Sequence, residues 1–157
     1  MDVEYGNGVI EMLTFYSRIL VAYDGSELSK KALDMAMELA KQDERIELTV
    51  VAVSNPPTAT SMGSYGIYNQ ELINDIRASA EKLINDVKEK IAVLPNKTST
   101  VILEGNPGRL IVDHANQTSC DLIIMGSRGL SGIKEMFLGS TSHYVVQRAN
   151  CPVFIVK

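Results

Sequence analysis

The sequence predicts a single α/β domain in which a parallel sheet carries helices on both faces, as in a doubly wound fold. Three observations lead to this prediction. Short runs of apolar and β-branched residues alternate with longer segments in which apolar residues recur every three or four positions. The strand-like runs are apolar throughout, which is typical of strands buried on both faces. The helical segments are long enough to return the chain to the start of a neighbouring parallel strand.

Five short runs are predicted to form the strands. They lie at residues 18–23, 46–53, 100–103, 122–125 and 152–156. Asp24 and Gly25 end the first run, and a pair of prolines after Asn55 ends the second. Pro152 stands at the first position of the last run, where a missing N–H disturbs a strand least.

Four helices are predicted between these strands. Ser26 offers an N-cap for the first, and Pro107 stands where the third begins. The second follows an apolar stripe over residues 72–91, and the fourth comes after a glycine-rich segment and carries Val145 and Val146. The inner stripe of the first helix is predicted to hold Leu28, Ala32, Met35, Ala36, Leu39 and Ala40. The inner stripe of the third helix is predicted to hold Leu110, Ile111, His114 and Ala115.

Two segments fall outside this regular alternation. Residues 1–16 are predicted to be an extension outside the domain, which spans residues 17–157. The stretch PPTATSMGSYGIYNQ, between the second strand and the second helix, has no period and is longer than most loops of a compact domain. Two interpretations of it stay open: Met62, Tyr65 and Tyr68 fold over a ligand as a lid, or the loop is disordered.

The composition excludes several classes of protein. The 157 residues carry 15 basic and 19 acidic side chains, a net charge of −4, so no basic field would attract nucleic acid. No apolar run approaches the ~20 residues of a membrane-spanning helix, and the acidic N-terminus lacks the basic start of a secretory signal. Cys120 and Cys151 form no C-x-x-C motif and are expected to be buried free thiols. A cytoplasmic protein is therefore expected.

The segment MGSRGLSGIKEMFLGST, residues 125–141, is the strongest indication of function. Gly126, Gly129 and Gly139 stand in the spacing G-x2-G-x9-G directly after a predicted strand, at the sheet edge where such folds bind ligands. The first two glycines are expected to allow positive φ and a close approach of the backbone to an anion. Two hydroxyl residues after the third glycine open a helix, whose N-terminus favours phosphate. The segment predicts a site for a chain of phosphates; the alternative is that the glycines only make tight turns.

Other phosphate-binding and catalytic motifs are missing. The P-loop pattern requires a glycine directly before its lysine and a serine or threonine directly after it. Lys134 has neither of these neighbours. The dinucleotide pattern G-x-G-x-x-G is absent after the first strand, where the chain reads DGSE. His114 is interpreted as a packing residue, and His143 has no serine or cysteine at a telling spacing. No residue is therefore assigned to catalysis or to a metal ion.

Taken together, four stretches resemble the ATP-binding branch of the universal stress protein family. They are ILVAYDGSELSKKAL, EGNP, DLIIMG with the G-x2-G-x9-G-[ST] spacing, and NCPVFIV, in this order. The resemblance covers about residues 17–157 and implies a Rossmann-like fold, with one five-stranded parallel sheet in the order 3-2-1-4-5 and helices on both faces. It also implies bound ATP, with Mg²⁺ or Mn²⁺ bridging the phosphates, and a homodimer joined through the last strand, residues 152–156.

The resemblance also assigns roles to single residues. The phosphate-contacting positions fall on Gly126, Gly129, Gly139 and Ser140, with Ser127, Arg128 and Thr141 close by. The acid near the ribose and phosphates falls on Asp24, and the residue whose backbone pairs with adenine falls on Val53. Ala22 stands where some relatives carry proline, and Tyr23 and Met125 are counted in the same site. From the residues alone, two alternatives stay open: Asp24 caps the following helix, and Arg128 is only solvated.

The predicted function is that of a nucleotide-binding homodimer that regulates a stress response. The alternatives are a slow ATP-hydrolysing enzyme of the same superfamily and a dimerisation module that binds no nucleotide. The missing general base counts against the enzyme, and the intact glycine spacing counts against the module. An apolar edge strand at residues 152–156 also favours a dimer, because pairing with a second copy covers its open backbone groups.

Overall fold

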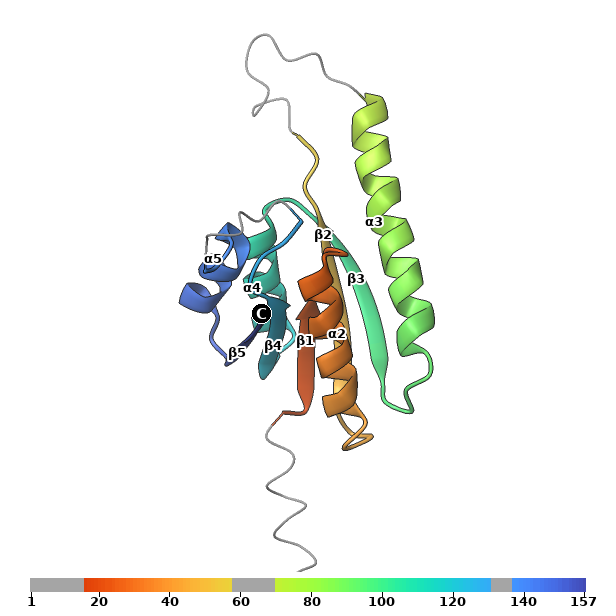
Figure 1. The fold of residues 1–157 in the computed structure, drawn as a ribbon, viewed down its shortest axis with the longest axis vertical. Coiled ribbons are helices and arrows are strands. Elements are labelled where there is room, and N and C mark those ends of the chain that lie inside the picture. The colour runs from red at the N-terminus through yellow and green to blue at the C-terminus, as the bar shows by residue number, and fades with distance from the viewer. Residues whose placement is uncertain (1–15, 58–69, 131–136) are drawn as a thin grey trace, which may run out of the picture.

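The computed structural model describes residues 16–57, 70–130 and 137–157, which form one parallel sheet and its helices (Figure 1). The strands, in the spatial order β3-β2-β1-β4-β5, are β1 Arg18–Ala22, β2 Glu47–Ser54, β3 Thr98–Glu104, β4 Leu122–Gly126 and β5 Val153–Val156. The helices between them are α2 Glu27–Ala40, α3 Gln70–Ile91, α4 Pro107–Gln117 and α5 Ser140–Arg148. The predicted doubly wound fold and its strand order are confirmed. None of these described helices combines the length and the apolarity that a bilayer crossing needs.

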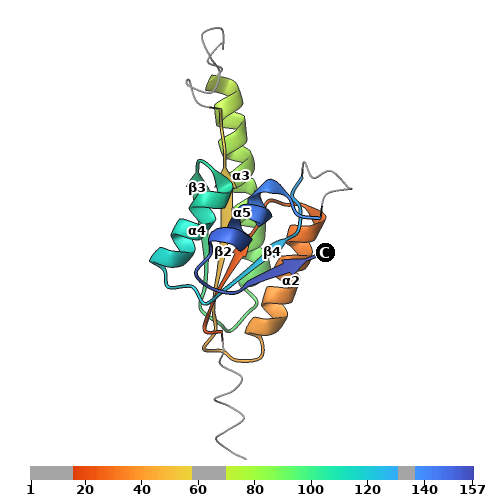
Figure 2. The ribbon, with the colours of Figure 1, turned by 90° about the vertical axis from the view of Figure 1, so that its left-hand side faces the viewer.

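The sheet separates two apolar clusters, each covered by a pair of helices (Figures 1 and 2). α2 and α3 pack on one face, and α4 and α5 pack on the other. Residues of β1 alternate between the two: Ile19 and Val21 belong to the α2/α3 cluster, and Leu20 and Ala22 to the α4/α5 cluster. Burial of both faces explains why the two central strands, β1 and β4, are apolar without alternation.

The helix α2 turns a slightly different face inward than the sequence pattern predicts. Its buried stripe includes Leu33 and Met37, whereas Met35 keeps 36% of its surface exposed. Neighbouring helix positions lie about 100° apart, so a broad apolar stripe leaves the line of contact open until the helix packs on the twisted sheet.

The same shift occurs in α4 and α5. In α4 Val112 is buried, while Leu110 and His114 are half-buried. In α5 Val145 is fully buried, whereas Val146 is 46% exposed. Burial lowers the pKa of His114, so its imidazole is favoured in the neutral form within the edge of the core.

The side chain of Asn96 ties the connection between α2 and β2. Its Nδ2 lies 2.9 Å from the carbonyl oxygens of Ala40 and Asp43 and 3.0 Å from that of Ile46. These carbonyls belong to the end of α2 and to the turn after it, where main-chain acceptors lack a helical partner. One buried amide therefore holds the turn that brings the chain into β2.

Cys120 and Cys151 lie at the amino ends of β4 and β5, and neither forms a disulfide. Both are half-buried, not buried as expected. The Cys120 thiol donates to the carbonyl oxygen of Leu122, 3.1 Å away. Burial raises the pKa of the Cys120 thiol to about 12 and also raises the pKa of Cys151. Both thiols are therefore protonated at neutral pH.

Candidate functional site

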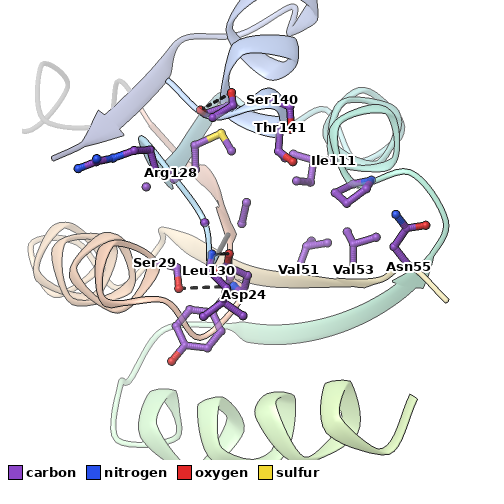
Figure 3. A pocket seen from close by; sticks show the side chains of 18 residues that line it. Asp24, Ser29, Val51, Val53, Asn55, Ile111, Arg128, Leu130, Ser140 and Thr141 are labelled. Carbon is purple, nitrogen blue, oxygen red and sulfur yellow. Dashed lines mark hydrogen bonds between the residues drawn. The ribbon is translucent and has the colours of Figure 1, made fainter. Parts of the chain in front are cut away.

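A cavity of about 560 Å³ lies beyond the carboxyl ends of β1, β2 and β4 (Figure 3). The chain leaves β1 toward α2 on one face of the sheet and leaves β4 toward α5 on the other, so the cavity lies at the topological switch point. Its volume is in the range of small-molecule sites. The cavity is lined by Ala22, Tyr23, Asp24, Ser29, Val51, Val53, Asn55, Pro107, Ile111, Met125, Gly126, Arg128, Gly129, Leu130, Gly139, Ser140, Thr141 and Ser142.

All but one of the predicted site residues line this cavity. The exception is Ser127, which is 2% exposed and stands behind the wall. The lining residues that the sequence did not predict are Ser29, Val51, Asn55, Pro107, Ile111, Leu130 and Ser142. The sequence pattern could have indicated two of them, because Val51 shares a strand face with Val53 and Ile111 was predicted on the inner stripe of its helix. The others lie in the first turns of helices or shortly after strands, where placement depends on packing.

Asp24 connects the end of β1 to the glycine segment. Its Oδ1 accepts from the Ser26 main-chain N–H at 3.0 Å, and its Oδ2 accepts from that of Leu130 at 3.2 Å. The N-cap of α2 is Ser26, whose hydroxyl oxygen accepts from the N–H of Ser29 at 3.2 Å. Asp24 therefore does not cap the helix itself, and its carboxylate stands at the rim of the cavity.

Close approach of neighbouring atoms, and not backbone conformation, accounts for glycine at positions 126 and 129. The expected positive φ is wrong for both, because the glycines with positive φ in the described chain are Gly25 and Gly105. A Cβ on Gly126 would lie 2.8 Å from the Leu28 Cβ and 3.1 Å from the Leu28 carbonyl carbon. A Cβ on Gly129 would lie 2.5 Å from Oδ2 of Asp24. The first glycine lets β4 end against the first turn of α2, and the second leaves space for the carboxylate.

The N-terminus of α5 forms the opposite part of the rim. Gly139 is the N-cap, with φ −73° and ψ 167°, and has no side chain to accept from the first turn. The N–H groups of that turn have no acceptor within the helix, so they are available to an anion. Ser140 and Thr141 follow Gly139 along the cavity wall (Figure 3).

Ser127 joins the two parts of the rim through its main chain. Its carbonyl oxygen accepts from the Gly139 N–H at 2.7 Å and from the Ser142 hydroxyl at 2.6 Å. Its own N–H donates to the carbonyl of Val156 in β5 at 2.8 Å. Hydrogen bonds thus connect the start of the glycine-rich segment, at Ser127, directly to its end, at Gly139.

Tyr23 and Arg128 direct their side chains away from the cavity. The Tyr23 ring packs against the α2/α3 cluster, where burial raises its pKa, so the main chain of Tyr23 faces the cavity. The Arg128 guanidinium points outward from the rim (Figure 3). Among the described lining residues, Asp24 and Arg128 carry the formal charges, and these cancel.

The remaining wall of the cavity is mainly apolar. Val51 and Val53 of β2 face Ile111 of α4 and Thr141 of α5 across it, with Asn55 at one end (Figure 3). The cavity therefore combines an apolar slot between strands and helices with a rim of main-chain N–H groups. This arrangement suits a ligand with a flat apolar part and an anionic part.

Several predicted features fall on other segments. Met62, Tyr65, Tyr68 and Lys134 lie outside the described residues. Within the described ranges, no group of three or more His, Cys, Asp and Glu side chains is placed to hold a metal ion.

The fold and the site define a class of protein: a doubly wound α/β domain whose glycine-rich segment borders a cavity at the switch point of the sheet. The pattern of the Universal stress protein family matches residues 15–157. The chain is also 38% identical over 148 residues to the Universal stress protein YxiE of Bacillus subtilis, covering 90% of this chain and 99% of YxiE. The chain belongs to the universal stress protein family.

Solved structures share this fold. The universal stress protein UspA from Lactobacillus plantarum matches with a TM-score of 0.75 and 27% identity, over 90% of this chain and 98% of UspA. A universal stress protein family protein from Arabidopsis thaliana, with AMP bound, matches with a TM-score of 0.64 and 20% identity, over 90% of this chain and 91% of that one. At this identity the second likeness concerns the fold alone.

Proposed function

We propose that the protein binds ATP in this cavity and acts as a homodimeric regulator of a stress response, as in the ATP-binding branch of its family. The observation that carries the proposal is the junction of the strand end at Gly126 and Gly129 with the N-terminus of α5 on one rim. A helix N-terminus and adjacent main-chain N–H groups favour phosphate. A cytoplasmic location is part of the proposal, because unpaired thiols suit a reducing compartment.

The apolar slot would hold the adenine ring. Val51, Val53 and Ile111 supply aliphatic surface to both sides of a flat group, and the main chain at the end of β2 would pair with the edge of the base. The AMP held by the Arabidopsis relative supports the fit of an adenine nucleotide to this fold. Asp24, at the rim between slot and glycines, would face the ribose.

A divalent cation would accompany the phosphates. The charges of Asp24 and Arg128 cancel, so the described lining adds no net positive charge to balance a triphosphate. Mg²⁺ or Mn²⁺ supplies that charge and keeps most of its ligands as water and phosphate oxygens. The chain's own part is to offer N–H donors from the strand end and from α5.

We expect binding without efficient catalysis. Asp24 is the carboxylate among the described lining residues, and both of its oxygens already accept main-chain hydrogen bonds. The main chain thus holds this carboxylate, and its role as a general base would require it to exchange one of these hydrogen bonds for an attacking water. Slow ATP hydrolysis is the alternative, and a turnover assay with Mg-ATP distinguishes it from binding alone.

The homodimer would form through β5. This strand lies at the edge of the sheet, and Phe154 on it is 46% exposed. The carbonyls of Pro152 and Val156 accept hydrogen bonds from Ile123 of β4 and from Ser127 directly after it. Strand alternation therefore directs the main-chain groups of Val153 and Ile155 to the open edge. Pairing with a second copy would satisfy these groups and cover the apolar side chains.

Calorimetry with Mg-ATP tests the nucleotide proposal, with a micromolar Kd expected for the native protein. Ser140→Asp places a negative charge in the first turn of α5, which favours the helix but repels phosphate. We expect at least a tenfold loss of ATP affinity in a folded protein, about 1.4 kcal/mol or more. Ser79→Asp, the same change on the exposed surface of α3, is the control and should bind normally.

Two results would contradict the proposal. If Ser140→Asp and the native protein bind ATP equally well, the phosphates do not contact α5. If millimolar Mg-ATP produces neither heat nor a thermal shift in the native protein, the dimerisation module becomes the better description. Mass spectrometry of the supernatant from denatured protein identifies any nucleotide that co-purifies.

A further inference from the structure

The side chain of Ser142, in the first turn of α5, is buried and donates across the glycine-rich segment. It is 2% exposed, whereas the neighbouring Ser140 is exposed. Its hydroxyl lies 2.6 Å from the Ser127 carbonyl oxygen and 3.1 Å from the Gly139 carbonyl oxygen. The shorter contact is therefore the one across the glycine segment, between residues 15 positions apart in sequence. A serine that only capped its own helix would bond the nearer main chain.

This bond joins the two elements that form the phosphate rim. Ser127 directly follows Gly126 at the end of β4, and Ser142 lies in the first turn of α5. The same carbonyl also accepts from the Gly139 N–H at 2.7 Å. Two donors from the start of α5 thus converge on one oxygen at the end of β4, which sets how far apart the two parts of the rim stand.

We propose that Ser142 is a positioning residue for phosphate: its hydroxyl holds the N-terminus of α5 against the end of β4, so that one ligand meets both parts of the rim. The inference rests on the proposed nucleotide function and adds a residue outside the G-x2-G-x9-G-[ST] pattern to it. The hydroxyl of Ser142 already donates to the Ser127 carbonyl oxygen, so it would affect phosphate through the position of the main chain and not by direct contact. Phosphate affinity, and not base affinity, should depend on it.

The test compares two ligands on Ser142→Ala. Loss of one neutral hydrogen bond should weaken Mg-ATP binding by about two- to tenfold in calorimetry. Adenosine, which has no phosphate, should bind Ser142→Ala and the native protein equally in an NMR titration. Ser142→Thr keeps a hydroxyl at the same place and should restore the ratio of the two affinities to its native value.

Ser54→Ala is the matched control. Ser54 is 4% exposed, and its hydroxyl has no hydrogen-bond partner in the described part of the chain, so alanine there removes the same group without removing a bond. We expect Ser54→Ala to leave the ratio of ATP to adenosine affinity unchanged. A ligand-free measurement completes the design: amide hydrogen exchange at Gly139 should be faster in Ser142→Ala than in Ser54→Ala.

The outcomes separate the two proposals. If the native protein binds ATP and Ser142→Ala keeps the native ratio, or loses ATP and adenosine equally, Ser142 does not position phosphate. If the native protein binds no ATP, the nucleotide proposal itself is contradicted. Unchanged exchange at Gly139 in the ligand-free variant would show that the hydroxyl does not hold the rim.

Discussion

Replacing Gly126 with alanine should destabilise the fold, although the residue belongs to the glycine pattern of the site. The new Cβ would lie 2.8 Å from the Leu28 Cβ, 3.1 Å from the Leu28 carbonyl carbon and 3.2 Å from the Ser29 nitrogen. Two of these atoms are main chain in the first turn of α2, so they cannot move without shifting the helix. A contact of 2.8 Å between two carbon atoms is strongly repulsive. The helix α2 would therefore have to move away from the end of β4.

The magnitude follows from two opposing effects. Overpacking of this kind lowers the free energy of unfolding by about 1–3 kcal/mol. Alanine also restricts the unfolded chain, and this effect raises the free energy of unfolding by about 0.4–1 kcal/mol. We expect a net loss of about 1–2 kcal/mol in the free energy of unfolding. For a domain of this length such a loss lowers the melting temperature by about 2–8 °C. Urea titration followed by circular dichroism measures it, with a lower midpoint and an unchanged slope.

Gly129→Ala provides the comparison. Its Cβ would meet Oδ2 of Asp24 at 2.5 Å, but that atom is the end of a side chain that can rotate away. We expect a stability loss below about 1 kcal/mol together with weaker ATP binding, because Asp24 leaves the rim. The reasoning is refuted if Gly126→Ala is as stable as the native protein, or if Gly129→Ala is the less stable of the two.

Three further predictions concern other parts of the molecule. Asn96→Ala should lower the free energy of unfolding by about 1–3 kcal/mol in a urea titration, because the buried amide that donates to three carbonyl oxygens is removed; an unchanged midpoint would contradict this. Ile155→Pro removes an N–H from the open edge of β5 and should give monomers in sedimentation, whereas Ser79→Asp should sediment as the native dimer; a native monomer at micromolar concentration would contradict the dimer. Because the pKa of Cys120 is raised to about 12, its thiol should react slowly with disulfide reagents at pH 7. The free energy of unfolding should also fall as the pH rises from about 9 toward 12, because the thiol of the unfolded chain ionises at a lower pH than the thiol of the folded protein. Rapid labelling of native Cys120 at pH 7 would show that the thiol is not protected.

The fold could be predicted from the sequence because its strands are short apolar runs and its helices carry broad apolar stripes. What the stripes could not predict was the rotation of each helix on the sheet, which buried Met37 of α2 in the core and left Met35 exposed. That rotation depends on the twist of the sheet and on the shapes of side chains from distant strands.

The site was predictable where it follows strand ends and less so where it depends on side-chain direction. Ala22 and Val53 face the cavity, as strand alternation allows, but the ring of Tyr23 must then face the opposite side of the sheet. The role of Ser142 could not be predicted, because its partner is a main-chain oxygen brought near by the return of α5. The reason for glycine at 126 was also hidden, since Leu28 is nearly a hundred residues away in sequence.

The close packing of Gly126 changes how the glycine pattern should be interpreted in related sequences. A relative that has lost its ligand would still need glycine at this position, because any larger residue pushes α2 away from β4. Glycine at 129 is under no such demand from the main chain, since its neighbour is a movable carboxylate. We therefore expect substitution at position 129 to be a better indicator of lost ligand binding among relatives than substitution at position 126, where packing alone already favours glycine.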